Sequence, residues 1–220
     1  MIGKLIVFEG VEGGGKTTQI QLLRNWLLDK CQLGKFLSKS LDLEVVVTRE
    51  PGGTKVGKIL RELLLNADVS GEQIQARAEL LLYAADRAHH IDALIKPSLE
   101  RGAIVLCDRF IDSTIAYQGY GRGLDLKLIQ ELNHIATGGL TSDLTFWLDI
   151  DVEIGLNRVK NRGKIDRIEQ TNIEFHQRVK TGYEELAKNN SLMVRIDAHL
   201  TVEKIQEQIQ EIMRKKLLEW

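Results

Sequence analysis

Residues 10–17 are Gly10-Val11-Glu12-Gly13-Gly14-Gly15-Lys16-Thr17. They match the pattern G-x-x-x-x-G-K-[ST] between an apolar stretch typical of a buried strand and a helical stretch that begins at Lys16. Glycines allow the backbone to curl so that its N–H groups point at phosphate oxygens, and the following helix N-terminus adds positive potential. The sequence therefore predicts a nucleoside triphosphate site in this loop, with Lys16 at the β- and γ-phosphates and Thr17 at Mg²⁺.

The rest of the chain alternates between short apolar stretches and longer helical patterns. The apolar stretches have the near-continuous hydrophobicity of buried parallel strands: Leu5–Phe8, Val45–Val47, Ala103–Cys107, Leu144–Leu148 and Met193–Ile196. Helices are predicted at Lys16–Lys30, from about Thr54, at Gln73–Leu99, at Asp125–Ala136, at Val152–Asn161 and after the N-cap Thr201. This alternation predicts an α/β fold with a five-stranded parallel sheet flanked by helices, whose ligands bind at the carboxyl ends of the strands. With no linker and no internal repeat, residues 1–220 form one predicted domain.

Composition excludes several functional classes. The 220 residues are 43% hydrophobic and 28% charged, which excludes a mainly disordered chain. Thirty basic and 31 acidic residues give a net charge of −1, so we expect no nucleic-acid partner and no attraction to an acidic membrane. The apolar stretches are too short to span a bilayer, and we expect no signal peptide. Cys31 and Cys107 lack metal-site spacing and are interpreted as reduced thiols of a cytoplasmic protein.

A second charged cluster follows the next two strands. Arg49 and Glu50 end the second strand, Asp108 and Arg109 end the third, and Arg61 lies on the helix from about Thr54. An ATPase needs no such cluster, whereas a phosphotransferase needs one to hold an acceptor that already carries a phosphate. Such an acceptor is ionised at neutral pH, so the reaction requires no general base. Adjacent histidines at 89 and 90 would point about 100° apart on a helix, so we interpret them as structural or exposed.

Two further segments are candidates for a base pocket and a lid. Tyr83 and Arg87 are four residues apart on one helix face and could stack on a base and contact its carbonyl, although taken alone the pair favours a core aromatic and a surface arginine. The stretch Ser113–Gln118 offers hydroxyls and an amide. Residues 158–167 hold five basic residues and a glycine, which suits either a solvated basic face or a mobile lid that excludes water from phosphoryl transfer.

The chain resembles the thymidylate kinase (dTMP kinase) family from Lys4 to about Ile209. The resemblance rests on the glycine-rich loop with Glu12 and on five further motifs: Thr-Arg-Glu-Pro-Gly-Gly-Thr at 48–54, Tyr-Ala-Ala-Asp-Arg at 83–87, Asp-Arg-Phe at 108–110, Ser-Thr-Ile-Ala-Tyr-Gln-Gly at 113–119 and Asp-Arg-Ile-Glu at 166–169. It implies a three-layer P-loop kinase fold and Mg²⁺- and ATP-dependent phosphorylation of dTMP to dTDP. It also implies a homodimer that packs through long helices, with Gln73–Leu99 in the shared face.

The resemblance also implies residue roles. ATP would contact Gly10, Val11, Glu12, Gly13, Gly14, Gly15, Lys16, Thr17 and Thr18. The acceptor dTMP would contact Glu12, Glu50, Pro51, Arg61, Tyr83, Arg87, Arg109, Thr114, Tyr117 and Gln118. At the phosphate and sugar, Arg61 and Arg109 would contact the phosphate, and Glu12 would lie near the 3′-hydroxyl. Tyr117 would lie where its ring crowds a ribose 2′-hydroxyl. At the base, Tyr83 would stack on the thymine ring, and Arg87 and Gln118 would contact the base edge with Thr114 nearby. Thr17 and Asp108 would hold Mg²⁺, and Lys16, Arg109, Arg158 and Arg162 would act in catalysis.

Residues 11–15 hold no arginine, whereas the lid at about 158–170 holds Arg158 and Arg162, as in the bacterial, lid-arginine type of the family. Three features depart from the family pattern. Tyr83 stands where phenylalanine is usual, residues 31–43 form a longer insertion, and Lys164 adds a charge to the lid.

Two other functions remain open on the residues. One is another nucleoside or nucleotide kinase of the same fold, and the other is a P-loop ATPase switch that binds partners or DNA.

Overall fold

The centre of the molecule is a parallel sheet. The structure is a computed structural model that describes residues 3–29, 43–66, 73–163 and 165–220. Its strands are β1 (Lys4–Glu9), β2 (Val45–Arg49), β3 (Ile104–Asp108), β4 (Leu144–Asp149) and β5 (Met193–Asp197). They run in the order β2-β3-β1-β4-β5, and all neighbouring pairs are parallel. All five predicted strands are confirmed, and each extends one or two residues further, to a charged residue at its carboxyl end.

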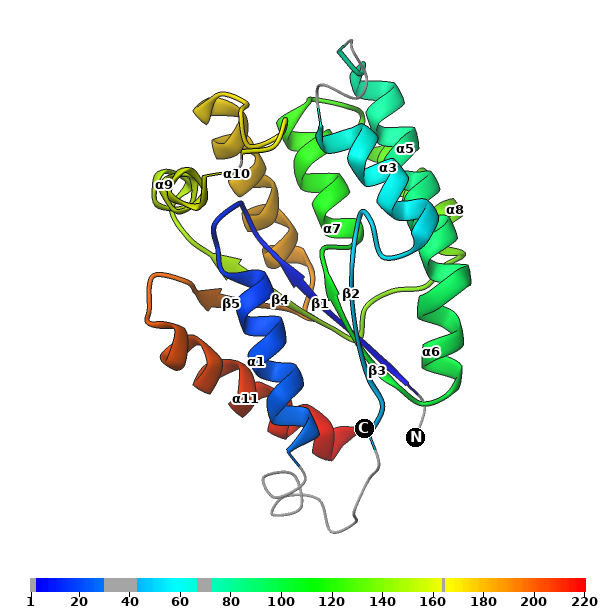
Figure 1. Ribbon diagram of the computed structural model, residues 1–220, viewed down its shortest axis with the longest axis vertical. Helices are drawn as coiled ribbons and strands as arrows, with labels where there is room; N and C mark the ends of the chain where they lie inside the picture. The colour runs from blue at the N-terminus through cyan, green and yellow to red at the C-terminus, as the bar shows by residue number, and fades with distance from the viewer. Residues whose placement is uncertain (1–2, 30–42, 67–72, 164) are drawn as a thin grey trace.

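Helices connect these strands and cover both faces of the sheet (Figure 1). The main helices are α1 (Lys16–Leu28), α3 (Lys55–Leu65), α5 (Ala76–His90), α8 (Leu126–Thr137), α9 (Val152–Arg162), α10 (Ile173–Asn189) and α11 (Val202–Glu219). Shorter segments are the π-helical η1 (Ile91–Ile95) and η2 (Ile115–Gly121) and the α-helical α6 (Lys96–Glu100) and α7 (Ile111–Thr114). Thr54 and Thr201 cap α3 and α11 through their hydroxyls, which accept from Gly57 N and Lys204 N. The sequence patterns did not predict α10, α7 or η2.

The long helix predicted at Gln73–Leu99 differs in the structure. It begins at Ala76, and the π-helical turns of η1 divide it into α5 and α6. Pro97 lies near the start of α6 and has no N–H to donate to the preceding turn. The wider π-helical turn lies directly before this proline, so the missing hydrogen bond falls at the irregularity.

The core forms three layers. On one face of the sheet, Ile6 and Phe8 of β1 pack in a cluster with Ile20 and Leu23 of α1 and with α11. On the other face, β1 and β3 pack against η1 through a second cluster: Leu5, Val7, Ile91, Ile95, Val105, Cys107 and Phe110. Cys107 is a buried free thiol. These two clusters, one on each face of the sheet, fix the carboxyl ends of β1, β2 and β3 beside one another.

Some expectations lie outside the described residues, namely those for Cys31, for Lys164 and, apart from Leu43, for the insertion at 31–43. Within the described part of the chain, no helix is both long and apolar enough to cross a membrane.

Candidate active site

A pocket lies at the carboxyl edge of the sheet, between the glycine-rich loop, the ends of β2 and β3, the helical segments α3, α5, α7 and η2, and the end of α9 with the segment that follows it. It brings together most of the predicted site residues: Glu12, Gly13, Gly14, Gly15, Lys16, Thr17, Thr18, Glu50, Pro51, Arg61, Tyr83, Arg87, Asp108, Arg109, Thr114, Tyr117, Gln118 and Arg162. Three predicted residues do not line it: Gly10, Val11 and Arg158. Residues that are far apart in the sequence thus converge on one pocket.

The glycine-rich loop wraps around the Lys16 side chain. Lys16 Nζ donates to the carbonyl oxygens of Gly10 at 3.0 Å and Val11 at 2.9 Å. Gly10 and Val11 therefore contact the Lys16 side chain instead of lining the pocket. Gly13 adopts the left-handed φ of 72°, and a Cβ there would collide with the Gly155 carbonyl of α9. Burial, together with the nearby Arg109, lowers the pKa of Lys16 to about 8. The loop is thus a compact cationic cradle that a polyphosphate would neutralise.

Two oxygen ligands suitable for Mg²⁺ adjoin this cradle. Thr17 Oγ1 donates to Asp108 Oδ2 at 3.0 Å, so the first turn of α1 meets the end of β3. Within the described ranges, no three His, Cys, Asp or Glu side chains gather closely enough to hold a metal alone. Mg²⁺ prefers oxygen ligands and usually keeps several waters beside substrate phosphates, so a hydroxyl and one carboxylate fit its chemistry.

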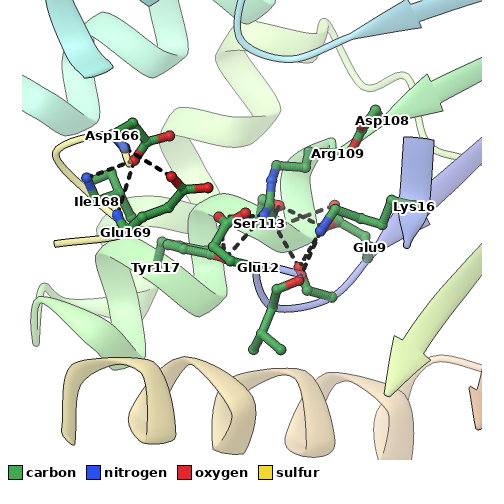
Figure 2. Close-up of polar contacts among 12 residues, drawn as sticks. Glu9, Glu12, Lys16, Asp108, Arg109, Ser113, Tyr117, Asp166, Ile168 and Glu169 are labelled. Atoms are coloured by element: carbon green, nitrogen blue, oxygen red, sulfur yellow. Dashed lines mark hydrogen bonds and ion pairs between the residues drawn. The ribbon is translucent and has the colours of Figure 1, made fainter. Parts of the chain in front are cut away.

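Arg109 is the most connected cation of the site (Figure 2). Its backbone has the left-handed φ of 73°, which is uncommon for a residue other than glycine. Nη2 donates to Glu12 Oε1 at 2.6 Å and to Tyr117 Oη at 3.1 Å, and the guanidinium lies over the Tyr117 ring. Burial opposes ionisation of Glu12, yet Arg109 and Lys16 outweigh it and lower its pKa to about 2. A carboxylate such as Glu12 would repel a phosphate in this loop, and its bond to Arg109 explains its presence, because Glu12 orients the arginine.

Glu9 supports this cluster from below, and sequence reasoning missed it. Its side chain is fully buried and accepts from Phe110 N at 2.8 Å, Ser113 Oγ at 2.6 Å and Tyr183 Oη at 2.8 Å. Ser113 and Tyr183 also accept from Arg109 Nη1. The available signal was a carboxylate that follows the apolar residues Leu5–Phe8 directly before the loop.

The base-pocket candidates on α5 have different environments. Arg87 is only 2% exposed, so the alternative of a surface arginine is wrong. It donates to Glu50 Oε2 at 2.7 Å, to Asn133 Oδ1 at 2.8 Å and to the Phe110 carbonyl at 3.0 Å. These three bonds use Nε and one hydrogen of each terminal nitrogen, which leaves two N–H groups of the guanidinium. Tyr83 lies one helical turn before it and lines the same pocket.

Of the two adjacent histidines, His90 has the structural role that the sequence predicts. Its ring is fully buried and contacts Thr48 Oγ1 at 2.6 Å and Glu50 Oε1 at 3.0 Å. His90 therefore packs Glu50 in place beneath Arg87, and neither histidine lines the pocket.

A second buried carboxylate, Glu79, also escaped sequence reasoning. It is fully buried in the first turn of α5. It accepts from Gln118 Nε2 at 2.9 Å, from Arg122 Nη2 at 3.3 Å and from Arg167 Nη2 at 2.5 Å. Burial opposes ionisation, but the bonds from Gln118 and Arg167 lower the pKa of Glu79. Glu79 thereby connects α5, η2 and the segment that follows α9.

The predicted lid segment begins in helix α9, which holds Arg158 and Arg162. Arg158 donates to the Gly13 carbonyl at 3.3 Å, so it contacts the glycine-rich loop from outside the pocket. Arg162 lines the pocket and donates to Glu169 Oε1 at 2.7 Å. Arg167 donates to the Leu64 carbonyl at 2.8 Å, which ties the segment to the end of α3. Figure 2 shows Glu169 beside Asp166 and Ile168, apart from the Arg109 cluster.

Known proteins are similar to this chain in both sequence and fold. A family model described as thymidylate kinase matches residues 8–209. The chain belongs to the thymidylate kinase family. It is 74% identical to the thymidylate kinase of Trichodesmium erythraeum, over all of this chain and 99% of that protein, and 56% identical to that of Nostoc punctiforme, over 97% of each. A crystal structure of the thymidylate kinase from Ehrlichia chaffeensis superposes with a TM-score of 0.75 at 33% identity, covering 96% of this chain and 98% of that one. The predicted thymidylate kinase resemblance and P-loop kinase fold are confirmed.

Proposed function

We propose that this thymidylate kinase family member transfers the γ-phosphoryl group of ATP to dTMP, giving ADP and dTDP. The observation that carries the proposal is one pocket with two cationic ends, the Lys16 cradle and the Arg109 cluster, which the Glu12 carboxylate joins. A triphosphate in the cradle and a monophosphate at Arg109 would meet end to end. In-line phosphoryl transfer needs that arrangement, and positioning supplies much of the rate enhancement.

The donor end suits Mg·ATP. We assign the backbone N–H groups from Gly13 to Thr18 to the phosphates, with Lys16 as the point charge at the β- and γ-phosphates. Thr17 and Asp108 would hold Mg²⁺. When bound, this ion would neutralise negative charge on the phosphates. ATP would also release Lys16 from the Gly10 and Val11 carbonyls that it contacts in the structure.

The acceptor end suits a deoxynucleoside monophosphate. Arg109 and Arg61 would hold its phosphate, and Tyr83 would stack on the base. Arg61 Nη1 donates to the Pro51 carbonyl at 3.0 Å, so the turn after β2 positions this arginine. Because the accepting phosphate oxygen is already ionised, the reaction needs no side chain to remove a proton.

The remaining acceptor contacts would surround the sugar and the base. We assign Glu50 and Pro51 to the wall behind the phosphate and Arg87 to the base edge. On the opposite side of the acceptor, Thr114 of α7 and Tyr117 and Gln118 of η2 would contact it. All of these residues line the pocket.

Residues 158–170 would act as a lid on the single domain formed by residues 1–220. Arg162 would stabilise charge on the moving phosphoryl group, because it is the lid arginine that lines the pocket. Arg158 would support it from the outer side of the glycine-rich loop. Exclusion of water by the closed lid would prevent hydrolysis of ATP.

We also propose a homodimer that forms through α3, α5 and α8, which lie together on one side of the molecule (Figure 1). Large apolar side chains are exposed along these helices: Val56 46%, Ile59 72%, Leu81 53%, Leu128 49% and Ile135 75%. Contiguous exposed apolar surface favours burial against a second copy. Sedimentation analysis should give a mass of two chains, and replacement of Ile59 and Ile135 by aspartate should give one. We place the enzyme in the cytoplasm, with ATP and dTMP as partners and with neither nucleic acid nor membrane.

The decisive experiment measures ADP release from ATP and Mg²⁺ with a panel of acceptors. We expect turnover that depends on dTMP and is much weaker with dCMP or AMP. Turnover with thymidine but not with dTMP would indicate a nucleoside kinase instead. ATP hydrolysis that is independent of any monophosphate would indicate an ATPase switch.

A further inference from the structure

The side-chain amide of Gln118 lines the acceptor pocket, and the direction in which it points determines what it can bind. Its oxygen accepts a hydrogen bond, whereas its nitrogen donates. Thymine carries a ring N3–H that donates, but cytosine has an unprotonated N3 that accepts. A Gln118 amide with its oxygen toward the pocket therefore favours thymine, and the reversed amide favours cytosine.

Glu79 determines this direction. Gln118 Nε2 donates to Glu79 Oε1 at 2.9 Å, and a carboxylate can only accept, so the nitrogen of the amide must face Glu79. The oxygen consequently lies on the other branch of the amide. Among the described residues, no donor to Gln118 Oε1 is found, and Gln118 lines the pocket, so the oxygen is left for a ligand.

The carboxylate of Glu79 is itself held rigidly. It is fully buried, with Arg167 Nη2 at 2.5 Å and Arg122 Nη2 at 3.3 Å from Oε2, and Arg122 Nε at 3.3 Å from Oε1. Two arginines keep it ionised and fix its plane, because both are permanent donors. The Arg122 guanidinium is in turn held over the Phe175 ring, 4.8 Å from its centroid. Rotation of the Gln118 amide would therefore turn its oxygen toward a fixed carboxylate oxygen, so that two acceptors would face each other.

We propose that Glu79 is a specificity-determining positioning residue, which selects an acceptor base with a ring N–H by holding the Gln118 amide with its oxygen toward the base. This inference rests on the proposed dTMP phosphorylation and deepens it. Glu79 touches no substrate and acts only through Gln118. Discrimination at the neighbouring exocyclic position is separate and belongs to Arg87, whose N–H groups can only donate.

The test replaces Glu79 by the isosteric glutamine. Two arginine N–H groups, from Arg167 Nη2 and Arg122 Nη2, need an acceptor at the Oε2 position, so the new amide oxygen takes that position. Its nitrogen then faces Gln118, and only the 3.3 Å bond from Arg122 Nε to the Oε1 position is lost. The Gln118 amide then reverses and presents its nitrogen to the base. The probes are dTMP and 5-methyl-dCMP, which share the methyl group and differ at N3 and at the exocyclic position. We expect Glu79→Gln to lower the ratio of their kcat/KM values by about tenfold, the equivalent of one mismatched hydrogen bond.

Two further variants separate positioning from general structural damage. Arg122→Gln removes another partner of the same carboxylate but leaves Glu79 facing Gln118, so the ratio should stay within about twofold of wild type. Gln118→Leu removes the amide and should itself lower the ratio. Adding Glu79→Gln in that background should change the ratio no further, because nothing remains to be oriented.

The outcomes are distinguishable. Suppose that the wild type phosphorylates dTMP but Glu79→Gln leaves the ratio of the two kcat/KM values unchanged, or that Arg122→Gln lowers this ratio as much as Glu79→Gln does. Either result overturns the role of Glu79 and leaves the proposed function intact. If Glu79→Gln does not fold, Gln118→Leu decides, since an unaltered ratio there overturns the proposal as well. Absence of dTMP turnover in the wild type overturns both the inference and the proposed function.

Discussion

Replacing Arg109 by lysine would test the central cation of the site. The guanidinium donates to five groups: the Gly10 carbonyl, Ser113 Oγ, Tyr183 Oη, Glu12 Oε1 and Tyr117 Oη. Lysine keeps the charge but has one nitrogen, so it cannot hold Glu12 and a phosphate in the same fork. Loss of two charge-assisted hydrogen bonds at about 1.5–2 kcal/mol each amounts to about 3–4 kcal/mol. That corresponds to a fall in kcat/KM for dTMP of roughly 10²–10³-fold.

The assay is steady-state ADP release at saturating ATP with dTMP varied, together with ATP binding by calorimetry. ATP affinity should stay within about threefold, because Lys16 and the loop amides are untouched. Arg101→Lys is the control for the substitution itself, since Arg101 forms an exposed ion pair with Glu44 at 2.9 Å, and such pairs contribute about 1 kcal/mol or less. A decrease in kcat/KM of less than fivefold in Arg109→Lys, or an equal loss of ATP affinity, would refute the assignment of Arg109 to the acceptor phosphate.

Three further predictions concern Arg162 and Lys16 of the site and Asp86, a buried residue of α5. Arg162→Ala should lower kcat by about 10²-fold with ATP affinity nearly unchanged, because its contact is made mainly in the transition state, and a change confined to KM would contradict the lid role. ATP binding at pH 8.5 should take up protons, because the triphosphate raises a Lys16 pKa that burial and Arg109 hold at about 8; calorimetry in buffers of different ionisation enthalpy would show this, and heats that do not vary with the buffer would contradict it. Burial and Glu50 raise the pKa of Asp86 from 3.8 to about 6, so its ionisation costs stability as pH rises through that interval. Asp86→Asn should therefore raise the free energy of unfolding at pH 7 by on the order of 1 kcal/mol but leave it unchanged at pH 4. Urea midpoints that are the same for the variant and the wild type at both pH values would argue against this.

Much of the fold could be predicted because its signals are local. A buried parallel strand shows as an apolar run, and all five such runs became strands. The glycine-rich loop was equally readable, because its backbone conformation requires glycine at Gly13, where a side chain would collide with α9. The break in the long helix was not readable in detail. Pro97 indicates that a backbone hydrogen bond is missing, but the placement of the π-helical turn before it depends on how η1 packs against β1 and β3.

The supporting carboxylates left a weaker signal, for a physical reason. Glu79 stands in the first turn of a helix, where an acidic residue is ordinarily explained by the helix dipole and solvent exposure. Its burial depends on Gln118 and Arg167, which lie 39 and 88 residues away in the sequence. Glu9 likewise depends on Tyr183, 174 residues away and on a helix that the pattern did not predict. Residues that contact ligands come from motifs whose chemistry is legible in short segments. Residues that orient those contacts derive their roles from tertiary neighbours, so a buried glutamate can be assigned only once its donors are located.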